Sequence, residues 1–415
     1  MMIKRLLYLT ILFTSGSSTL EAKEPSDTNY DERKVPDYEL PDPLVGQEGR
    51  PVGLGEWESH RRAEILRLFE ESVYGTTPRR KLSVSYKVVE NDRNAFDGLA
   101  TRKQVAAFFG DRNYRLDILL YIPNKPATPV PAFAGLNFKG NHAVQSDSEI
   151  IRQMRRNSAR ERGASASRWP VRMLVESGYA LATIHRDQVD PDNYRNDFSD
   201  GIHPLFYDEG QKKPGPEEWG SIGAWAWSLS RILDYLETDE RIDAKRVAVM
   251  GHSRLGKTAL WAGAQDNRFA MVISNNSGSG GAALYRRCYG ERIHHILKPV
   301  PYWFCTNHRK YSKREHELPV DQHMLLALMA PRPVYVASAT EDRWADPKGE
   351  FLAAKHASPV YALYGKSGLS GLDMPEPDNP IHTTIGYHLR TGKHGVTTYD
   401  WQQYINFADG FLKSD

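Results

Sequence analysis

The chain has 415 residues, of which 40% are hydrophobic and 26% charged, and its formal net charge is +2. This composition predicts a globular protein with a large hydrophobic core and excludes a disordered or fibrous chain. The charge is nearly balanced, and no basic run is interleaved with aromatic residues in the way that a phosphate-backbone surface requires. We therefore expect no nucleic-acid partner.

The first residues have the layout of a secretory signal peptide. Lys4 and Arg5 precede an apolar run at 6–13, and small polar residues continue up to Ala22. The apolar run is too short to span a bilayer, so we expect residues 1–22 to be a signal that is removed. No later segment is apolar enough to span either, and the mature protein is expected to be a secreted or periplasmic monomer without a membrane anchor.

The chain contains two cysteines, Cys288 and Cys305. In an oxidising compartment they could form one disulfide, and two buried thiols are the alternative. The sequence leaves both possibilities open.

The N-terminal part predicts packing elements rather than chemistry. Residues 23–55 are polar and proline-rich and are expected to form an extended arm that carries no chemistry. Apolar residues at helical spacing predict a helix at 61–74. Three strands separated by turn residues predict an antiparallel edge; they lie near 82–89, 103–109 and 114–123.

From residue 129 onward, strands and helices alternate, which is typical of an α/β fold with a mainly parallel sheet. Helices are expected at 170–176, 217–237 and 398–412. Strands are expected at 129–138, 179–184, 246–250, 269–274, 333–338 and 360–365. A long polar loop reaches Gly215, and loops of that length are usually functional or mobile. An insertion at about 277–330 is expected to lie over the carboxyl ends of the strands and shape a pocket.

The stretch from Val247 to Trp261 predicts a buried strand, a glycine turn and a helix, with Ser253 at the top of the turn. A serine in this position projects its hydroxyl away from the sheet, close to the free N–H groups of the helix. This geometry suits a nucleophile. The usual nucleophile elbow is G-x-S-x-G, whereas here the second glycine, Gly256, comes one position late.

The same residues allow a second interpretation, because Gly251 to Thr258 also fits the phosphate-binding pattern G-x-x-x-x-G-K-T. A phosphate loop normally follows the first strand of its domain, whereas several strands precede this one. An exported protein would also meet little nucleotide. Position and compartment therefore favour the serine nucleophile.

The order serine, acid, histidine along the chain is the one that an α/β-hydrolase sheet imposes. His394 follows the last predicted strand, and Gly392 and Gly395 let the backbone there turn tightly. We therefore expect His394 to be the base that accepts the proton of the serine. His382 and His388 lie in the same segment and are interpreted as loop histidines.

The acid is expected in the loop after the strand at 333–338, where Asp342 is the first choice, Asp346 the second and Glu341 the third. It would fix the tautomer of the imidazole and stabilise the imidazolium. The amide of Arg254 would donate to the oxyanion, and its guanidinium would add charge. Lys257 would face the same cleft one helical turn later, and a surface ion pair is its alternative role.

We predict no metal and no cofactor. His294 and His295 are adjacent, so on a regular element their rings are expected to point apart, and nothing nearby in sequence completes a metal set.

The seven residues Gly251-His252-Ser253-Arg254-Leu255-Gly256-Lys257 match the signature G-C-S-R-x-G-K. With this signature and the late histidine, the sequence resembles the glucuronoyl esterases of carbohydrate esterase family fifteen from about residue 45 to the C-terminus. His252 in the cysteine place resembles the bacterial branch. The resemblance implies an α/β-hydrolase fold, with a mostly parallel central sheet between two helical layers, as a single catalytic domain at 56–415.

The resemblance also implies roles for individual residues: Ser253 as nucleophile, His394 as base and Arg254 in the oxyanion site. Lys257, Glu291 and Trp344 would hold the glucuronoyl sugar. Fungal members have a Glu where this chain has Asn276, and an amide cannot act as the acid, so the later Asp342 takes that role. The disulfide that fungal members form from position 252 cannot form here.

The implied reaction is hydrolysis of the ester between (4-O-methyl-)glucuronic acid on xylan and an alcohol of lignin. Removal of acetyl groups from xylan on the same scaffold is the first alternative. A P-loop nucleotide hydrolase and an inactive carbohydrate-binding relative are more remote ones.

Overall fold

The computed structural model describes residues 25–46, 49–111, 114–125, 128–152, 154–155, 157–193 and 195–413. The predicted signal peptide, 1–22, lies outside these ranges. The described chain is built on one ten-stranded sheet with the strand order β1-β2-β3-β5-β4-β6-β7-β8-β10-β9. The mostly parallel α/β-hydrolase architecture predicted from the sequence is confirmed.

One side of the sheet is antiparallel, as the three early strand signals predict. It consists of β1 (Val84–Asn94), β2 (Ala100–Phe109) and β3 (Tyr114–Pro123). β2 and β3 pair without a break from Ala100 opposite Pro123 to Phe109 opposite Tyr114. β3 then pairs antiparallel with β5, which joins this edge to the parallel part of the sheet.

The parallel part carries the segments that end at the site. Its strands are β5 (Ala180–His185), β4 (Val130–Asn137), β6 (Ile242–His252), β7 (Met271–Asn275), β8 (Val334–Ala339) and β10 (Ile385–Arg390). Because helices cover both faces, these strands are buried nearly throughout, which explains their continuous apolar sequences.

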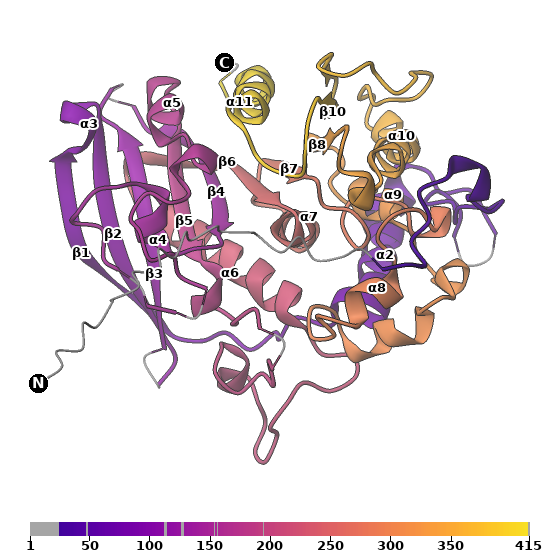
Figure 1. Cartoon of the computed structure of the whole chain (residues 1–415), viewed down its shortest axis with the longest axis horizontal. Coiled ribbons are helices and arrows are strands. Elements are labelled where there is room, and N and C mark those ends of the chain that lie inside the picture. Colours follow the sequence, from indigo (N-terminus) through magenta and orange to yellow (C-terminus); the bar gives the residue numbers. More distant parts are fainter. Residues whose placement is uncertain are drawn as a thin grey trace, which may run out of the picture.

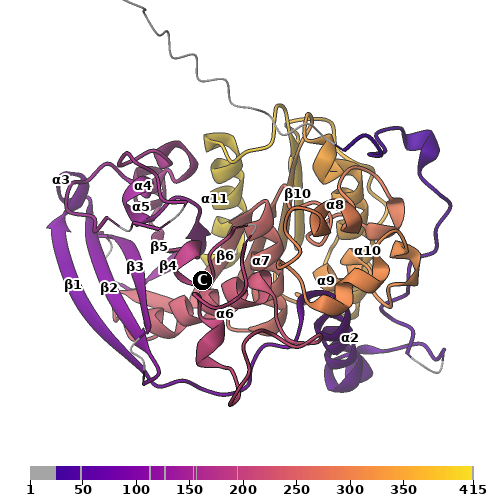
Figure 2. The ribbon, with the colours of Figure 1, turned by 60° about the horizontal axis from the view of Figure 1, so that its bottom comes forward.

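The helices form two layers around the sheet (Figures 1 and 2). α5 (Val171–Glu176) and α11 (Thr398–Leu412) cover one face, and α6 (Ser221–Leu236) and α7 (Arg254–Gln265) cover the other. Each layer has its own hydrophobic cluster against the sheet: Trp401 and Tyr404 of α11 belong to one, and Trp225 and Trp261 to the other. The core therefore lies on both faces and holds the strand ends rigidly.

The last strand was predicted wrongly. The segment 360–365 does not form a strand, because residues 360–363 complete the helix α10 (Pro347–Leu363). Ala354, Ala357 and Tyr361 are buried at helical spacing along α10, so the apolar run at its end is the continuation of a helical face. The strand before the predicted base is β10, which carries the two-residue β9 (Ile381–His382) at the sheet edge.

The remaining elements are short. The helix predicted at 61–74 begins earlier, with α1 (Leu54–Glu56), and contains two π-helical turns (Trp57–Arg61 and Glu70–Tyr74) on either side of α2 (Arg62–Phe69). The segment between β7 and β8 contains α8 (Ile293–Leu297) and α9 (Gln322–Ala327). α3 (Ala95–Gly98) and α4 (Asn141–Val144) are the remaining α-helices of the described residues.

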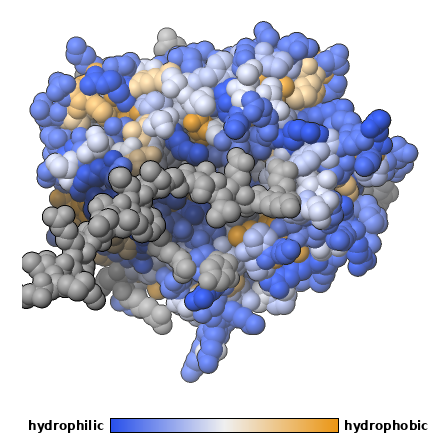
Figure 3. Space-filling model, viewed as in Figure 1, coloured by the Kyte–Doolittle hydropathy of each residue, from blue (hydrophilic) through white to orange (hydrophobic). Residues whose placement is uncertain are grey.

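Cys288 and Cys305 are both free thiols, which answers the question that the sequence left open. Burial raises the pKa of each thiol to about 11, so neither is a reactive thiolate near neutral pH. The face in Figure 3 is mostly hydrophilic, with small scattered hydrophobic spots. Within the described ranges, no helix has the length and apolar character needed to cross a membrane.

Candidate active site

Ser253 stands between the end of β6 and the first residue of α7, with φ +58° and ψ −130°. This left-handed backbone is uncommon for a residue with a side chain and is typical of the strained turn of a nucleophile elbow. The turn is fixed on both sides, because the Ser253 amide donates to Asn275 O (2.8 Å) and its carbonyl accepts from Gly256 N (2.8 Å). The strand-to-helix turn predicted from the sequence is thus present.

Two glycines make this turn possible. A Cβ at Gly251 would lie 1.8 Å from the carbonyl oxygen of Leu255, and one at Gly256 would lie 2.9 Å from the Ser277 Cβ. The late second glycine therefore has a packing reason, since α7 approaches the turn after β7 at that position.

His394 and Asp342 are in direct contact. β10 pairs with β8 so that Arg390 lies opposite Ala339, which brings the following loops side by side. His394 Nδ1 lies 2.5 Å from Asp342 Oδ2. Ser253 and His394 line the same cavity, but among the described residues no hydrogen bond joins the serine hydroxyl to the imidazole.

The structure brings only one of the three candidate acids to the histidine. Asp342 is 5% exposed and also accepts from Asn276 Nδ2 at 2.8 Å. Asp346 instead pairs with Arg287 Nε at 2.8 Å and caps α10 through Gly349 N. Glu341 also lines the cavity, but no hydrogen bond among the described residues joins it to the imidazole of His394. Asn276 therefore supports the carboxylate of Asp342.

His252, next to the serine, packs against His394, with ring centroids 4.5 Å apart. Burial lowers the pKa of His252 well below its usual value, and the neighbouring His394 lowers it further. His252 therefore stays neutral beside His394 and adds no repulsion when that ring becomes protonated.

The side chain of Arg254 is held by a residue that the sequence did not single out. Its Nη1 donates to Asp192 Oδ2 at 2.6 Å, and its guanidinium lies 4.5 Å from the centre of the Trp303 ring. Asp192 Oδ1 accepts from Tyr302 Oη (2.7 Å) and Trp303 Nε1 (2.9 Å), and its Oδ2 also accepts from Arg186. Asp192 comes from the long polar loop after β5.

Burial acts to raise the pKa of Asp192, but the charges of Arg186 and Arg254 and the hydrogen bonds from Trp303 and Tyr302 outweigh it and lower this pKa to about 2. The carboxylate is therefore ionised whenever the protein is folded near neutral pH, and it holds Arg254 at the edge of the cavity.

Lys257 is buried, so the alternative of a surface ion pair is wrong. Its Nζ donates to the carbonyls of Ser277 and Ser279, each at 2.6 Å, and to Glu291 Oε2 at 2.8 Å. Glu291 Oε1 in turn accepts from Trp344 Nε1 at 3.2 Å. All three Nζ donors of Lys257 thus have acceptors within the protein, which fixes its side chain and the Glu291 carboxylate in the cavity wall.

A buried carboxyl group, that of Glu350, stabilises the turn at Ser277 and Gly278 that Lys257 contacts. Glu350 Oε1 accepts from the amides of Ser277 (2.8 Å) and Gly278 (3.0 Å), and Oε2 accepts from Ser338 Oγ (2.7 Å). Burial raises the pKa of Glu350 to about 8. This residue fixes the turn whose carbonyls receive Lys257.

These groups surround a cavity of about 640 Å³. Its lining includes every catalytic and substrate-binding residue predicted from the sequence, together with residues that the prediction did not include, among them Tyr30, Trp303, Arg343 and Lys393. The insertion after β7 supplies Glu291 and Trp303, as expected for a segment that shapes a pocket. Tyr30 comes from the N-terminal arm, which therefore forms part of the cavity wall, and the expectation that the arm carries no chemistry stays a prediction.

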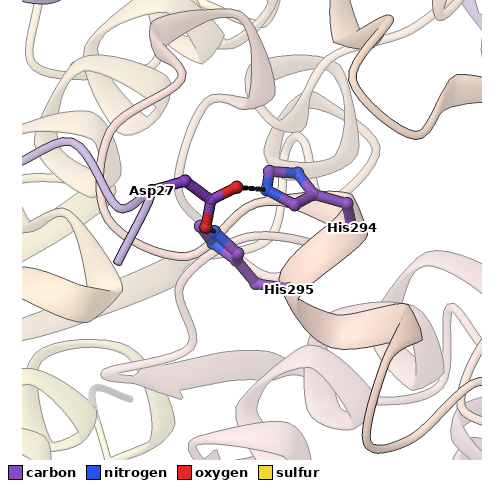
Figure 4. A group of neighbouring side chains, drawn as sticks. All are labelled: Asp27, His294 and His295. Atoms are coloured by element: carbon purple, nitrogen blue, oxygen red, sulfur yellow. Dashed lines mark hydrogen bonds and ion pairs between the residues drawn. The ribbon is translucent and has the colours of Figure 1, made fainter. Parts of the chain in front are cut away.

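The expectation that His294 and His295 point apart is also wrong. Their Nε2 atoms lie 3.0 and 3.1 Å from the two carboxylate oxygens of Asp27, as Figure 4 shows. The ligand atoms of the three residues all lie within 4.8 Å of one another. The third member comes from the arm and could not be found by looking near the histidines in sequence.

Comparison with known proteins identifies similar chains. Residues 166–365 match the family described as "Glucuronyl esterase, fungi". The chain is 48% identical over 402 residues to a carbohydrate esterase from an unknown prokaryotic organism, covering 93% of this chain and 92% of that protein. It is 26% identical to a 4-O-methyl-glucuronoyl methylesterase of Phanerochaete carnosa, over 92% of this chain and 84% of that one.

Solved structures agree with these matches. The glucuronoyl esterase of Solibacter usitatus has a TM-score of 0.87 and 48% identity, and the alignment covers 91% of this chain and 99% of that one. A promiscuous esterase of carbohydrate esterase family 15 from a marine bacterial metagenome has a TM-score of 0.86 and 47% identity over 93% of this chain and 100% of that chain.

Proposed function

This chain belongs to the glucuronoyl esterase family, carbohydrate esterase family 15, whose members are carboxylic ester hydrolases, and we propose that its substrate is the ester between (4-O-methyl-)glucuronic acid on xylan and an alcohol of lignin. The observation that carries the proposal is the contact of His394 Nδ1 with Asp342 Oδ2 at 2.5 Å in the cavity that Ser253 lines. The uronate assignment is supported by relatives named 4-O-methyl-glucuronoyl methylesterase.

In the proposed reaction, Ser253 Oγ attacks the carbonyl carbon of the ester while His394 Nε2 takes the hydroxyl proton. Asp342 orients the ring and stabilises its protonated form. No hydrogen bond joins the serine and the imidazole in this structure, and such contacts often tighten only in the substrate complex. His394 then gives the proton to the departing alcohol, and water releases the uronic acid from the serine in the reverse sequence.

The negative charge on the carbonyl oxygen would be stabilised by Arg254. Its amide is the first N–H of α7 and has no partner inside the helix, so it is available to an oxyanion. Its guanidinium, held by Asp192 and Trp303, adds a positive charge beside that position. Lys257, Glu291 and Trp344 form one connected chain in the wall, and we assign the glucuronoyl ring to it.

The export signal at 1–22, the secreted or periplasmic location and the single catalytic domain at 56–415 remain part of the proposal. A substrate in the plant cell wall requires an enzyme outside the cytoplasm, which is consistent with the charged and apolar pattern of the first residues.

The test compares two classes of ester. Purified protein should release benzyl alcohol from benzyl glucuronate with a kcat/KM about a hundredfold above its kcat/KM for acetylated xylo-oligosaccharides, because the cavity offers charged and hydrogen-bonding groups to a uronate. A preference for acetyl esters would replace the proposal with the acetyl xylan esterase alternative. Hydrolysis of neither would contradict both.

A further inference from the structure

The N-terminal arm is fastened at several points to the part of the molecule that lines the cavity. Asp27 accepts from His294 and His295. The carbonyl of Asn29 accepts from Gly290 N at 2.9 Å, immediately before Glu291. The arm therefore follows the cavity rim rather than lying on a remote surface.

The cluster of Asp27 with the two histidines is best described as a hydrogen-bonded clamp. A His-His-Asp set is a common zinc donor set. Here, however, Arg292 N donates to His295 Nδ1 at 3.2 Å, so Nδ1 is the acceptor and the ring proton sits on Nε2, directed at Asp27. A metal on Nε2 would need the opposite tautomer. Lys313 Nζ, 3.8 Å from Asp27 Oδ2, would also repel a cation.

A second set of charges fastens the arm on the other side of Tyr30. Glu32 Oε1 pairs with Arg287 Nη2 at 2.7 Å, and Glu32 Oε2 pairs with Lys348 Nζ at 3.0 Å. The six-residue stretch from Asp27 to Glu32 is thus fixed at both ends, which limits the positions that Tyr30 can take.

Tyr30 is itself held against the cavity wall. The guanidinium of Arg343 lies 4.8 Å from the centre of its ring, and Tyr289 meets it edge-on at 6.0 Å. The Tyr30 carbonyl accepts from Arg343, and Tyr289 Oη donates to the same carbonyl at 3.3 Å. Tyr30 and Arg343 both line the cavity beside Trp344.

From this arrangement we infer that Tyr30 and Arg343 form a second sugar-binding subsite, which takes the pyranose unit attached to the glucuronic acid. The inference rests on the proposed function. The alcohol must leave next to His394, which donates its proton, so the wall beside Glu291 and Trp344 belongs to the saccharide. An aromatic ring with an adjacent guanidinium offers a stacking face and hydrogen-bond donors to sugar hydroxyls.

The test compares two benzyl esters that differ only in the saccharide: benzyl glucuronate and a xylo-oligosaccharide bearing the same benzyl glucuronate as a branch. Tyr30→Ala should raise KM for the oligosaccharide about three- to tenfold, with kcat unchanged and with no change on benzyl glucuronate. Asp27→Ala, which opens the clamp, should act in the same direction with a smaller effect.

Tyr38→Ala is the matched control, because Tyr38 is a half-buried tyrosine of the same arm that packs against the main core and does not line the cavity. It should leave both KM values unchanged. Equal effects of Tyr30→Ala on both esters, no effect on either, or the same effect from Tyr38→Ala would overturn the subsite. If the unmodified enzyme cleaves neither ester, the proposed function fails instead.

Discussion

The most informative perturbation outside the catalytic residues is Asp192→Asn. The side chain of Asp192 is 1% exposed and has Arg254, Arg186, Tyr302 and Trp303 as its donors. Asparagine keeps the shape of the aspartate side chain but removes its negative charge. Its NH₂ group would also face the hydrogen-bond donors that the carboxylate oxygen accepts from. We expect the substitution to displace the Arg254 guanidinium from the oxyanion position.

The magnitude follows from the pKa of Asp192, which falls from 3.8 to about 2 in the folded protein. At about 1.4 kcal/mol per pKa unit, the ionised carboxylate stabilises the fold by about 2 kcal/mol at neutral pH. Because the folded pKa is the lower one, this stabilisation is present above pH 4 and is lost as the pH falls toward 2. An oxyanion donor is worth about 100- to 1,000-fold in kcat, so misplacing Arg254 should lower kcat at least tenfold.

The assays are denaturant unfolding and steady-state hydrolysis of benzyl glucuronate. The unfolding free energies of the unmodified protein and of Asp192→Asn should differ by about 2 kcal/mol at pH 7 and converge between pH 4 and pH 2. Asp187→Asn is the control, because Asp187 is equally buried and pairs with Arg186 at 3.3 Å but not with Arg254. A kcat within twofold of the unmodified value for Asp192→Asn, or an equal kcat loss for Asp187→Asn, would refute the positioning role.

Two further predictions concern the buried supports of the cavity. Lys257→Met should lower the unfolding free energy by about 1 to 3 kcal/mol because it leaves the Glu291 carboxylate, whose side chain is 13% exposed, without its cation. Adding Glu291→Gln should restore part of the loss, and strict additivity of the two changes would contradict this coupling. Burial raises the pKa of Glu350 from 4.5 to about 8, so the folded state binds a proton more readily and the unfolding free energy should fall as the pH rises through that interval. Glu350→Gln should flatten this fall, and identical slopes for the two proteins would count against it.

Much of the fold was predictable because the parallel strands are buried on both faces and are therefore continuous apolar runs. The chain order of Ser253, Asp342 and His394 was predictable for a related reason, since each lies just after a strand of one sheet. The choice among Asp342, Asp346 and Glu341 was not decided by position alone. The choice depends on the direction of each side chain within one loop: Asp346 points to Arg287 and not to His394.

The remaining errors arise where the partners are distant in sequence. Asp192 meets Arg254 across 62 residues, and Asp27 meets His295 across 268, so no local pattern reveals either contact. The helix end at 360–363 was read as a strand because Val360 and Tyr361 favour strands locally. The tertiary packing of α10 overrides that preference.

The most direct test of the central claim is the turnover of benzyl glucuronate by Ser253→Ala. If Ser253 is the nucleophile activated by His394, removing its hydroxyl oxygen should lower kcat at least about 10,000-fold while the unfolding transition stays in place. A folded Ser253→Ala protein that turns over the ester within tenfold of the unmodified rate would contradict the account.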